Sequence, residues 1–279
     1  MLRMLIAFPF YVVILFFSLR KNKQKKIAKP IYGWAIIMGL LGYYISSLFD
    51  FIGLQYISAG IERIILFIYP TLAVIINLLV FKVPIQKKQW MSIGITYLGI
   101  GIAYLGEFSQ MSNTNLFIFG SFMVLLCGIT YAFYLVGTGK LIPLMGATTY
   151  TSVAMIAASI GIFSHYSWEA YSNASSHSFL YSIPSNIVWY VIALAMIATV
   201  IPSFLLSSGM KRVGSNNLAI ITSIGPVATL FQANWILHEP FSWQQVMGTL
   251  LVIYGVVLIK KVGVTETNPN HPDYPSPKG

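Results

Sequence analysis

The chain has 279 residues, of which 57% are hydrophobic and only 9% are charged, whereas soluble proteins carry about 25% charged residues. So few charged side chains cannot cover the surface of a soluble globular protein of this size, which excludes that class. The net charge of +10 does not indicate a nucleic-acid-binding protein, because the basic residues lie in short segments between long apolar runs. We therefore expect lipid to surround most of the chain.

Nine apolar runs reach the length of about 20 residues that a helix needs to cross a membrane. They are residues 2–20, 32–54, 59–81, 89–106, 115–138, 146–164, 186–208, 216–237 and 243–260. The sequence thus predicts an all-α integral membrane protein, a bundle of nine transmembrane helices. A Ser-rich loop is expected at 165–185 and a disordered tail at 263–279.

The basic residues predict the orientation of these helices. All of the 17 Lys and Arg residues except Arg3 and Arg63 lie in segments that nine helices place on one side of the membrane. Segments rich in Lys and Arg stay in the cytoplasm. We therefore predict a cytoplasmic C-terminus and tail, with the 165–185 loop on the outer side.

The chain has few of the residues that bind metals or carry out catalysis. It has one cysteine, Cys127, together with four His and seven acidic residues, and none of them has metal-ligand spacing. No Walker motif for ATP hydrolysis occurs. We predict no metal, no cofactor and no enzymatic activity. A lipid-modifying membrane enzyme is a less favoured alternative, because such enzymes gather His and carboxylate groups near one interface.

An internal repeat relates the two halves of the chain. At an offset of 156 residues, the segment from Gly53 to Ala103 matches the segment from Gly209 to Ile259 without gaps, and Pro70 matches Pro226. This offset makes the repeat five helices long, and an odd number of helices inverts the second copy in the membrane, as in many secondary transporters. The first repeat is assigned to residues 1–106, with four helices, and the second to 115–262, with five. A partner for the helix that begins near Asn115 is missing from the first repeat.

The residues of both copies resemble the EamA family of the drug/metabolite transporter superfamily. Each copy has a helix start rich in small residues, a proline within the helix and a following glycine-rich helix. The segments are residues 57–63, Tyr69-Pro70-Thr71 and 90–106 in the first copy, and Gly214-Ser215, Gly225-Pro226 and His238-Glu239-Pro240 in the second. The resemblance implies ten helices in two inverted five-helix repeats.

The same resemblance implies a location in the bacterial inner membrane and a secondary transporter that works by alternating access. The expected solute is a small organic metabolite, either an amino acid-like compound or a drug, and export is the expected direction. Protons are the candidate coupling ion, and the sequence leaves a homodimer open. The alternative is a truncated membrane protein that does not transport.

Three charged residues lie near the outer ends of the second and third predicted helices. Asp50, Glu62 and Arg63 are candidates for an outer gate, because charged groups inside a membrane are costly unless they have a function or a partner. The alternative is that these side chains reach the interface or form a structural ion pair.

Polar residues on two helices predict a central solute cavity. Glu62, Tyr69 and Asn77 share one face of the third helix, at i, i+7 and i+15. The alternative is that such residues hold helices together by hydrogen bonds worth about 0.6 kcal/mol each. The cavity candidates are Tyr44, Tyr69, Asn77, Tyr131, Tyr134, Asn216, Ser223 and Asn234. Pro70 and Pro226 are the expected helix breaks, because proline removes a backbone hydrogen bond.

Overall fold

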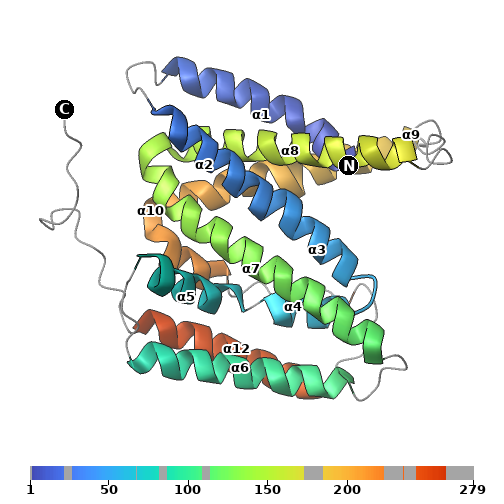
Figure 1. Cartoon of the computed structure of the whole chain (residues 1–279), viewed down its shortest axis with the longest axis vertical. Coiled ribbons are helices and arrows are strands. Elements are labelled where there is room, and N and C mark those ends of the chain that lie inside the picture. Colours follow the sequence, from blue (N-terminus) through green and yellow to red (C-terminus); the bar gives the residue numbers. More distant parts are fainter. Residues whose placement is uncertain are drawn as a thin grey trace, which may run out of the picture.

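The computed structural model describes residues 2–21, 27–66, 68–81, 87–108, 114–172, 185–222, 235 and 243–261. These residues form a bundle of helices, shown in Figure 1. Six helical stretches in this part of the chain are long and apolar enough to cross a membrane. The expected all-helical membrane architecture is therefore confirmed for the described residues, while the nine spans and the repeats stay predictions.

The helices follow the predicted apolar runs closely in the first half, except that the run at 59–81 forms two helices. Two of the elements, η1 and η4, are short π-helical segments within longer helical stretches. The elements are α1 (Leu2–Lys21), α2 (Lys29–Gly39), η1 (Leu40–Ile45), α3 (Ser46–Gly53), α4 (Ala59–Leu66), α5 (Tyr69–Phe81), α6 (Lys87–Phe108), α7 (Thr114–Met145), α8 (Ala147–Ser172), α9 (Ser185–Ala195), η4 (Met196–Val200), α10 (Ile201–Thr222) and α12 (Trp243–Lys261).

The second half differs from the predicted boundaries at three places. The connection expected at 139–145 is helical, and only Gly146 separates α7 from α8. Helix α8 continues into the loop expected at 165–185 and ends at Ser172. Helix α10 runs through the connection expected at 209–215, because Lys211 and Arg212 can keep their charged ends exposed while the backbone stays hydrogen bonded in the helix.

Helix α7 lies at the centre of the bundle. It packs against α2, η1, α3, α4 and α5 from the first half and against α8 and α10 from the second, and Figure 1 shows it crossing the middle of the molecule. Its inward side chains, such as Val124 and Tyr134, are buried. By contrast α1, at one edge, exposes large apolar side chains such as Val13 and Phe17, as expected for a helix that faces lipid.

Three pairs of elements begin 156 residues apart, which is the offset of the sequence repeat. The first residues are Lys29 and Ser185 for α2 and α9, Leu40 and Met196 for η1 and η4, and Lys87 and Trp243 for α6 and α12. The last pair packs side by side at the edge of the bundle (Figure 1). There Gly99 of α6 meets the backbone of Gly248 and Val252 so closely that a Cβ atom would clash.

Candidate functional site

A cluster of tyrosines joins three elements near the centre of the bundle. The rings of Tyr69, at the start of α5, and Tyr131 of α7 have centroids 5.3 Å apart, and the rings of Tyr131 and Tyr134 are 5.6 Å apart. Tyr43 of η1 adds a fourth ring 5.0 Å from Tyr134. The Tyr134 hydroxyl donates a hydrogen bond to the Tyr43 hydroxyl over 3.0 Å. We call Tyr43, Tyr69, Tyr131 and Tyr134 the tyrosine cluster.

The π-helical segment η1 positions the first of these rings. Gly42 lies so close to the ring of Tyr134 that a Cβ atom would clash with it, so this position has no room for a side chain. The next residue, Tyr43, contacts α7, whereas Tyr44 contacts α8, where its hydroxyl lies 3.1 Å from Nδ1 of His165. π-Helical segments inside helices occur frequently at functional sites.

Hydroxyl groups also link the helices around the tyrosine cluster. Thr138 and Tyr150 are hydrogen bonded over 2.7 Å between α7 and α8, and Thr151 donates to Ser207 of α10 over 2.6 Å. Tyr11 of α1 is bonded to Ser203 of α10 over 3.0 Å. Because a buried hydroxyl without a partner is costly, these pairs fix how the helices meet.

The three charged residues proposed as an outer gate come together between α3 and α4. Glu62 is only 1% exposed, and its Oε2 atom lies 3.1 Å from Nε of Arg63, which is 45% exposed. The carboxyl group of Asp50 lies beside that of Glu62. Asp50 Oδ1 and both Glu62 oxygens lack a hydrogen bond of good geometry among the described residues. The cluster therefore holds two carboxyl groups against one guanidinium group.

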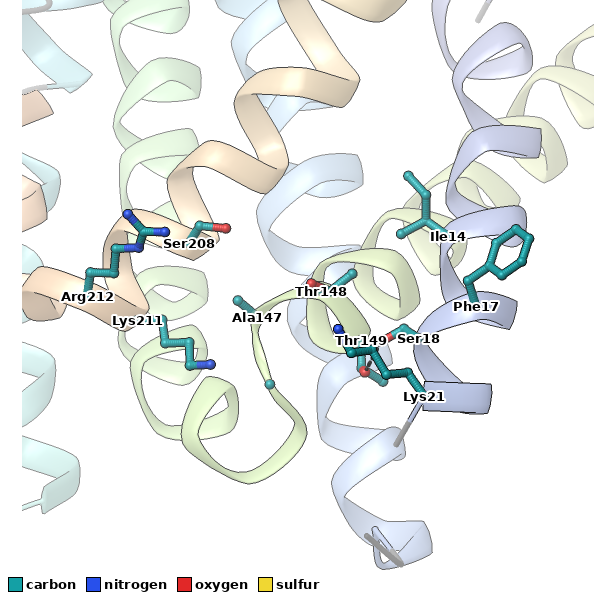
Figure 2. Close-up of a pocket in the computed structure, with 11 residues that line it drawn as sticks. Ile14, Phe17, Ser18, Lys21, Ala147, Thr148, Thr149, Ser208, Lys211 and Arg212 are labelled. Carbon is teal, nitrogen blue, oxygen red and sulfur yellow. Dashed lines mark hydrogen bonds between the residues drawn. The ribbon is translucent and has the colours of Figure 1, made fainter. Parts of the chain in front are cut away.

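A pocket of about 560 Å³ lies at another place, between α1, α8 and α10. Figure 2 shows three basic side chains around it, Lys21 from α1 and Lys211 and Arg212 from α10. The turn at Gly146 and the first residues of α8 also line it. None of the predicted cavity residues lines this pocket.

The structure thus brings together Tyr69, Tyr131 and Tyr134, and separately Asp50, Glu62 and Arg63. Tyr44 points to α8 instead of joining the tyrosine cluster. Asn77 lies in α5 and Asn216 in α10, where the structure describes the backbone of these two residues but not their side chains. Ser223, Pro226 and Asn234 fall outside the described residues. The helix expected at 59–81 is divided into α4 and α5, and Pro70 is the second residue of α5.

Sequence reasoning missed three residues of these networks, namely Tyr43, Thr138 and Tyr150. Thr138 could have been found, because Tyr131, Tyr134 and Thr138 lie at i, i+3 and i+7 on one face of α7. Tyr43 could not, because its direction depends on the wider turn of η1.

Comparison with known proteins identifies the relatives of this chain. A model of the EamA-like transporter family matches residues 1–105 and 118–260. Uncharacterized transporter YcbK of Bacillus subtilis is 29% identical over 215 residues, which cover 75% of this chain and 66% of YcbK. Uncharacterized transporter YetK of the same organism is 26% identical over 263 residues, which cover 93% of this chain and 77% of YetK.

Two further similarities are to an archaeal protein and to a solved structure. An uncharacterized transporter of Archaeoglobus fulgidus is 22% identical over 258 residues, 92% of this chain and 86% of the archaeal protein. A solved crystal structure with 15% sequence identity superposes on 94% of this chain and 87% of its own, with a TM-score of 0.58. At that identity the superposition shows a shared fold alone.

Proposed function

The chain belongs to the EamA-like transporter family, and from this we propose that it carries a small organic solute across the membrane by alternating access between two inverted repeats. Family membership and the apolar helices make it a multi-pass membrane protein of the transporter kind. The solute, its direction of movement and the mechanism are our proposal. The observation that carries it is the tyrosine cluster, which joins η1 and α5 to the central helix α7.

The repeated element boundaries support the inverted repeats. A π-helical segment begins at Leu40 and another at Met196, 156 residues later, so the irregularity recurs with the sequence repeat. Gly99 packs against Gly248 and Val252, whose repeat counterparts, Ser92 and Thr96, lie in the same helix as Gly99. An element that touches its own repeat copy is the arrangement expected beside a two-fold axis between the repeats.

The tyrosine cluster suits a solute that has both an apolar surface and hydrogen-bonding groups. Tyrosine rings offer flat apolar area, and their hydroxyls both donate and accept hydrogen bonds. Tyr69, Tyr131 and Tyr43 are each partly exposed, whereas Tyr134 is 1% exposed and supports them from behind. We assign the three partly exposed rings to solute contact and Tyr134 to their positioning. An amino acid-like compound fits this chemistry.

The cluster of Asp50, Glu62 and Arg63 is proposed as the outer gate and as the site that carries a coupling proton. When two carboxyl groups lie side by side, the negative charge of one disfavours the ionisation of the other. One guanidinium group balances only one carboxylate, so a shared proton would neutralise the cluster. Release of this proton would change the contacts between α3 and α4, which makes the cluster suited to link proton movement to opening.

Transport by the purified protein in liposomes tests the proposal. Separate pools of radiolabelled aromatic, aliphatic, acidic and basic amino acids are offered, and uptake is measured against empty liposomes. At least one pool should be transported, and Tyr131→Ala should reduce its uptake at least tenfold. The matched control is Tyr190→Ala, because Tyr190 is 75% exposed on α9.

Two outcomes would count against the proposal. If the inserted wild-type protein moves no amino acid pool and no wider panel of cationic drugs, the non-transporting alternative gains support. If Tyr131→Ala and Tyr190→Ala transport equally well, the tyrosine cluster is not the solute path.

A further inference from the structure

We propose that the pocket between α1, α8 and α10 is a binding site for a phosphate-bearing anion. The proposal concerns a place separate from the tyrosine cluster and does not depend on the identity of the transported solute. Its basis is a cavity of about 560 Å³ that is lined by three cations from two helices and by the N-terminus of a third helix.

The positive charge of the pocket is not balanced by the described residues that line it. Lys21, Lys211 and Arg212 are exposed, and no Asp or Glu occurs among the described residues of the lining. Figure 2 shows the Lys21 side chain reaching from α1 toward the first turn of α8, and the Lys211 side chain pointing from α10 toward the same turn. Like charges around one cavity repel one another, and a bound anion would offset this repulsion.

The N-terminus of α8 adds to this positive field. Gly146 has a φ of 82°, which permits the one-residue turn between α7 and α8 and leaves the first turn of α8 facing the pocket. The Tyr150 N–H already bonds to the Gly146 carbonyl, at 3.0 Å, whereas the N–H groups of the three preceding residues have no partner within the helix. Free N–H groups at a helix N-terminus bind phosphate.

The lining has two kinds of wall, which suits a phosphate attached to an organic group. Ser18, Thr148 and Ser208 supply hydroxyl groups near the cations, whereas Ile14 and Phe17 form an apolar wall on α1. Phe17 is 63% exposed and belongs to the lipid-facing surface of α1. An anionic phospholipid whose headgroup enters the pocket and a soluble phosphate compound share the chemistry recognised here.

The test measures the unfolding temperature of the full chain in detergent by tryptophan fluorescence. Short-chain phosphatidylglycerol is titrated in one arm and short-chain phosphatidylcholine in a second. A third arm compares inorganic phosphate with chloride at equal ionic strength. The double variant Lys211→Gln/Arg212→Gln removes two pocket cations, and Lys29→Gln is the matched control, because Lys29 is an exposed lysine at the start of α2 that does not line the pocket.

Phosphatidylglycerol should raise the unfolding temperature of the wild type and of Lys29→Gln, and phosphatidylcholine should not. The double variant should need about 30-fold more phosphatidylglycerol, as expected for the loss of two cations near a phosphate. Lys21→Gln, on a different helix, should need about fivefold more and provides a second test if the double variant does not fold. Stabilisation by inorganic phosphate as well assigns the site to soluble phosphate compounds, and stabilisation by the lipid alone assigns it to the headgroup.

Two results would overturn the site. In the first, neither phosphatidylglycerol nor phosphate stabilises the wild type more than its neutral or chloride control. In the second, Lys29→Gln weakens the stabilisation as much as the pocket variants do, which would show that the stabilisation comes from general surface charge.

Discussion

Individual polar residues in this bundle are stabilised by neighbours on other helices. Side-chain hydrogen bonds join Tyr134 to Tyr43, Tyr150 to Thr138 and Tyr11 to Ser203. Glu62 differs from them, since its neighbours among the described residues are the charged groups of Arg63, the next residue in the chain, and of Asp50, a second acid. A group that is so well buried and so poorly paired is a functional candidate by default inside a membrane.

Replacement of Glu62 tests its proposed role with a proton. Glu62→Gln keeps the size of the side chain but removes its ability to ionise, so transport should continue while its dependence on external pH is lost. The measurement is uptake of the transported amino acid pool between pH 5 and pH 9, with pyranine fluorescence inside the liposomes to follow protons. Glu169→Gln, which changes an exposed acid near the end of α8, should keep the wild-type pH profile. An unchanged profile in Glu62→Gln would remove this residue from coupling.

The hydrogen bond between Tyr134 and Tyr43 gives a second prediction at this scale. Tyr134→Phe should lower the free energy of unfolding by about 1 kcal/mol, the usual value for one such bond. Unfolding in sodium dodecyl sulphate measures the change. The double variant Tyr43→Phe/Tyr134→Phe should lose little more than either single variant, because both remove the same bond. Fully additive losses would show that the two hydroxyls do not interact.

At the scale of helices, hydrophobic patterns predicted most of the elements but not the places where they bend. The run at 32–54 became the stretch α2, η1 and α3, because a long apolar segment must satisfy its backbone within a helix in lipid. The wide turn at η1 has no signature in the apolar pattern, so the direction of Tyr43 was not predictable. The single-residue turn at Gly146 was missed for a related reason. One glycine between two apolar runs does not reveal its positive φ.

Gly42 of η1 and Gly33 of α2 are a matched pair of positions that tests how this stretch packs. Gly42→Ala places a methyl group against the Tyr134 ring and should lower the free energy of unfolding by about 1–3 kcal/mol, as overpacking does. Gly33→Ala, on the same stretch, meets no atom within 4 Å and should be neutral or stabilising by up to about 1 kcal/mol. Both changes are measured by the unfolding assay used for Tyr134. Equal effects would mean that η1 does not lie against α7 as described.

At the scale of the molecule, most of the helix ends that carry basic residues lie on one side. The ends of α1 and α12 and the beginnings of α2, α6 and α8 all lie on the left in Figure 1, whereas the N-terminus and the end of α8 lie on the right. The left-hand ends carry Lys21, Lys29, Lys87 and Lys261. The pocket between α1, α8 and α10, called the basic pocket below, lies near these ends. The arrangement supports a cytoplasmic left side, because basic segments stay in the cytoplasm.

Reporter fusions test this orientation directly. Alkaline phosphatase is active only outside the cytoplasm, so a fusion after Gly279 should be inactive, and an insertion after Ser172, at the opposite end of the bundle, should be active. A green fluorescent protein fusion at the same two positions serves as the reciprocal control, since it should fluoresce only at the C-terminus. The reverse pattern would place the basic pocket outside the cell. There the headgroup assignment would concern the outer leaflet, and the cluster of Asp50, Glu62 and Arg63 would become an inner gate.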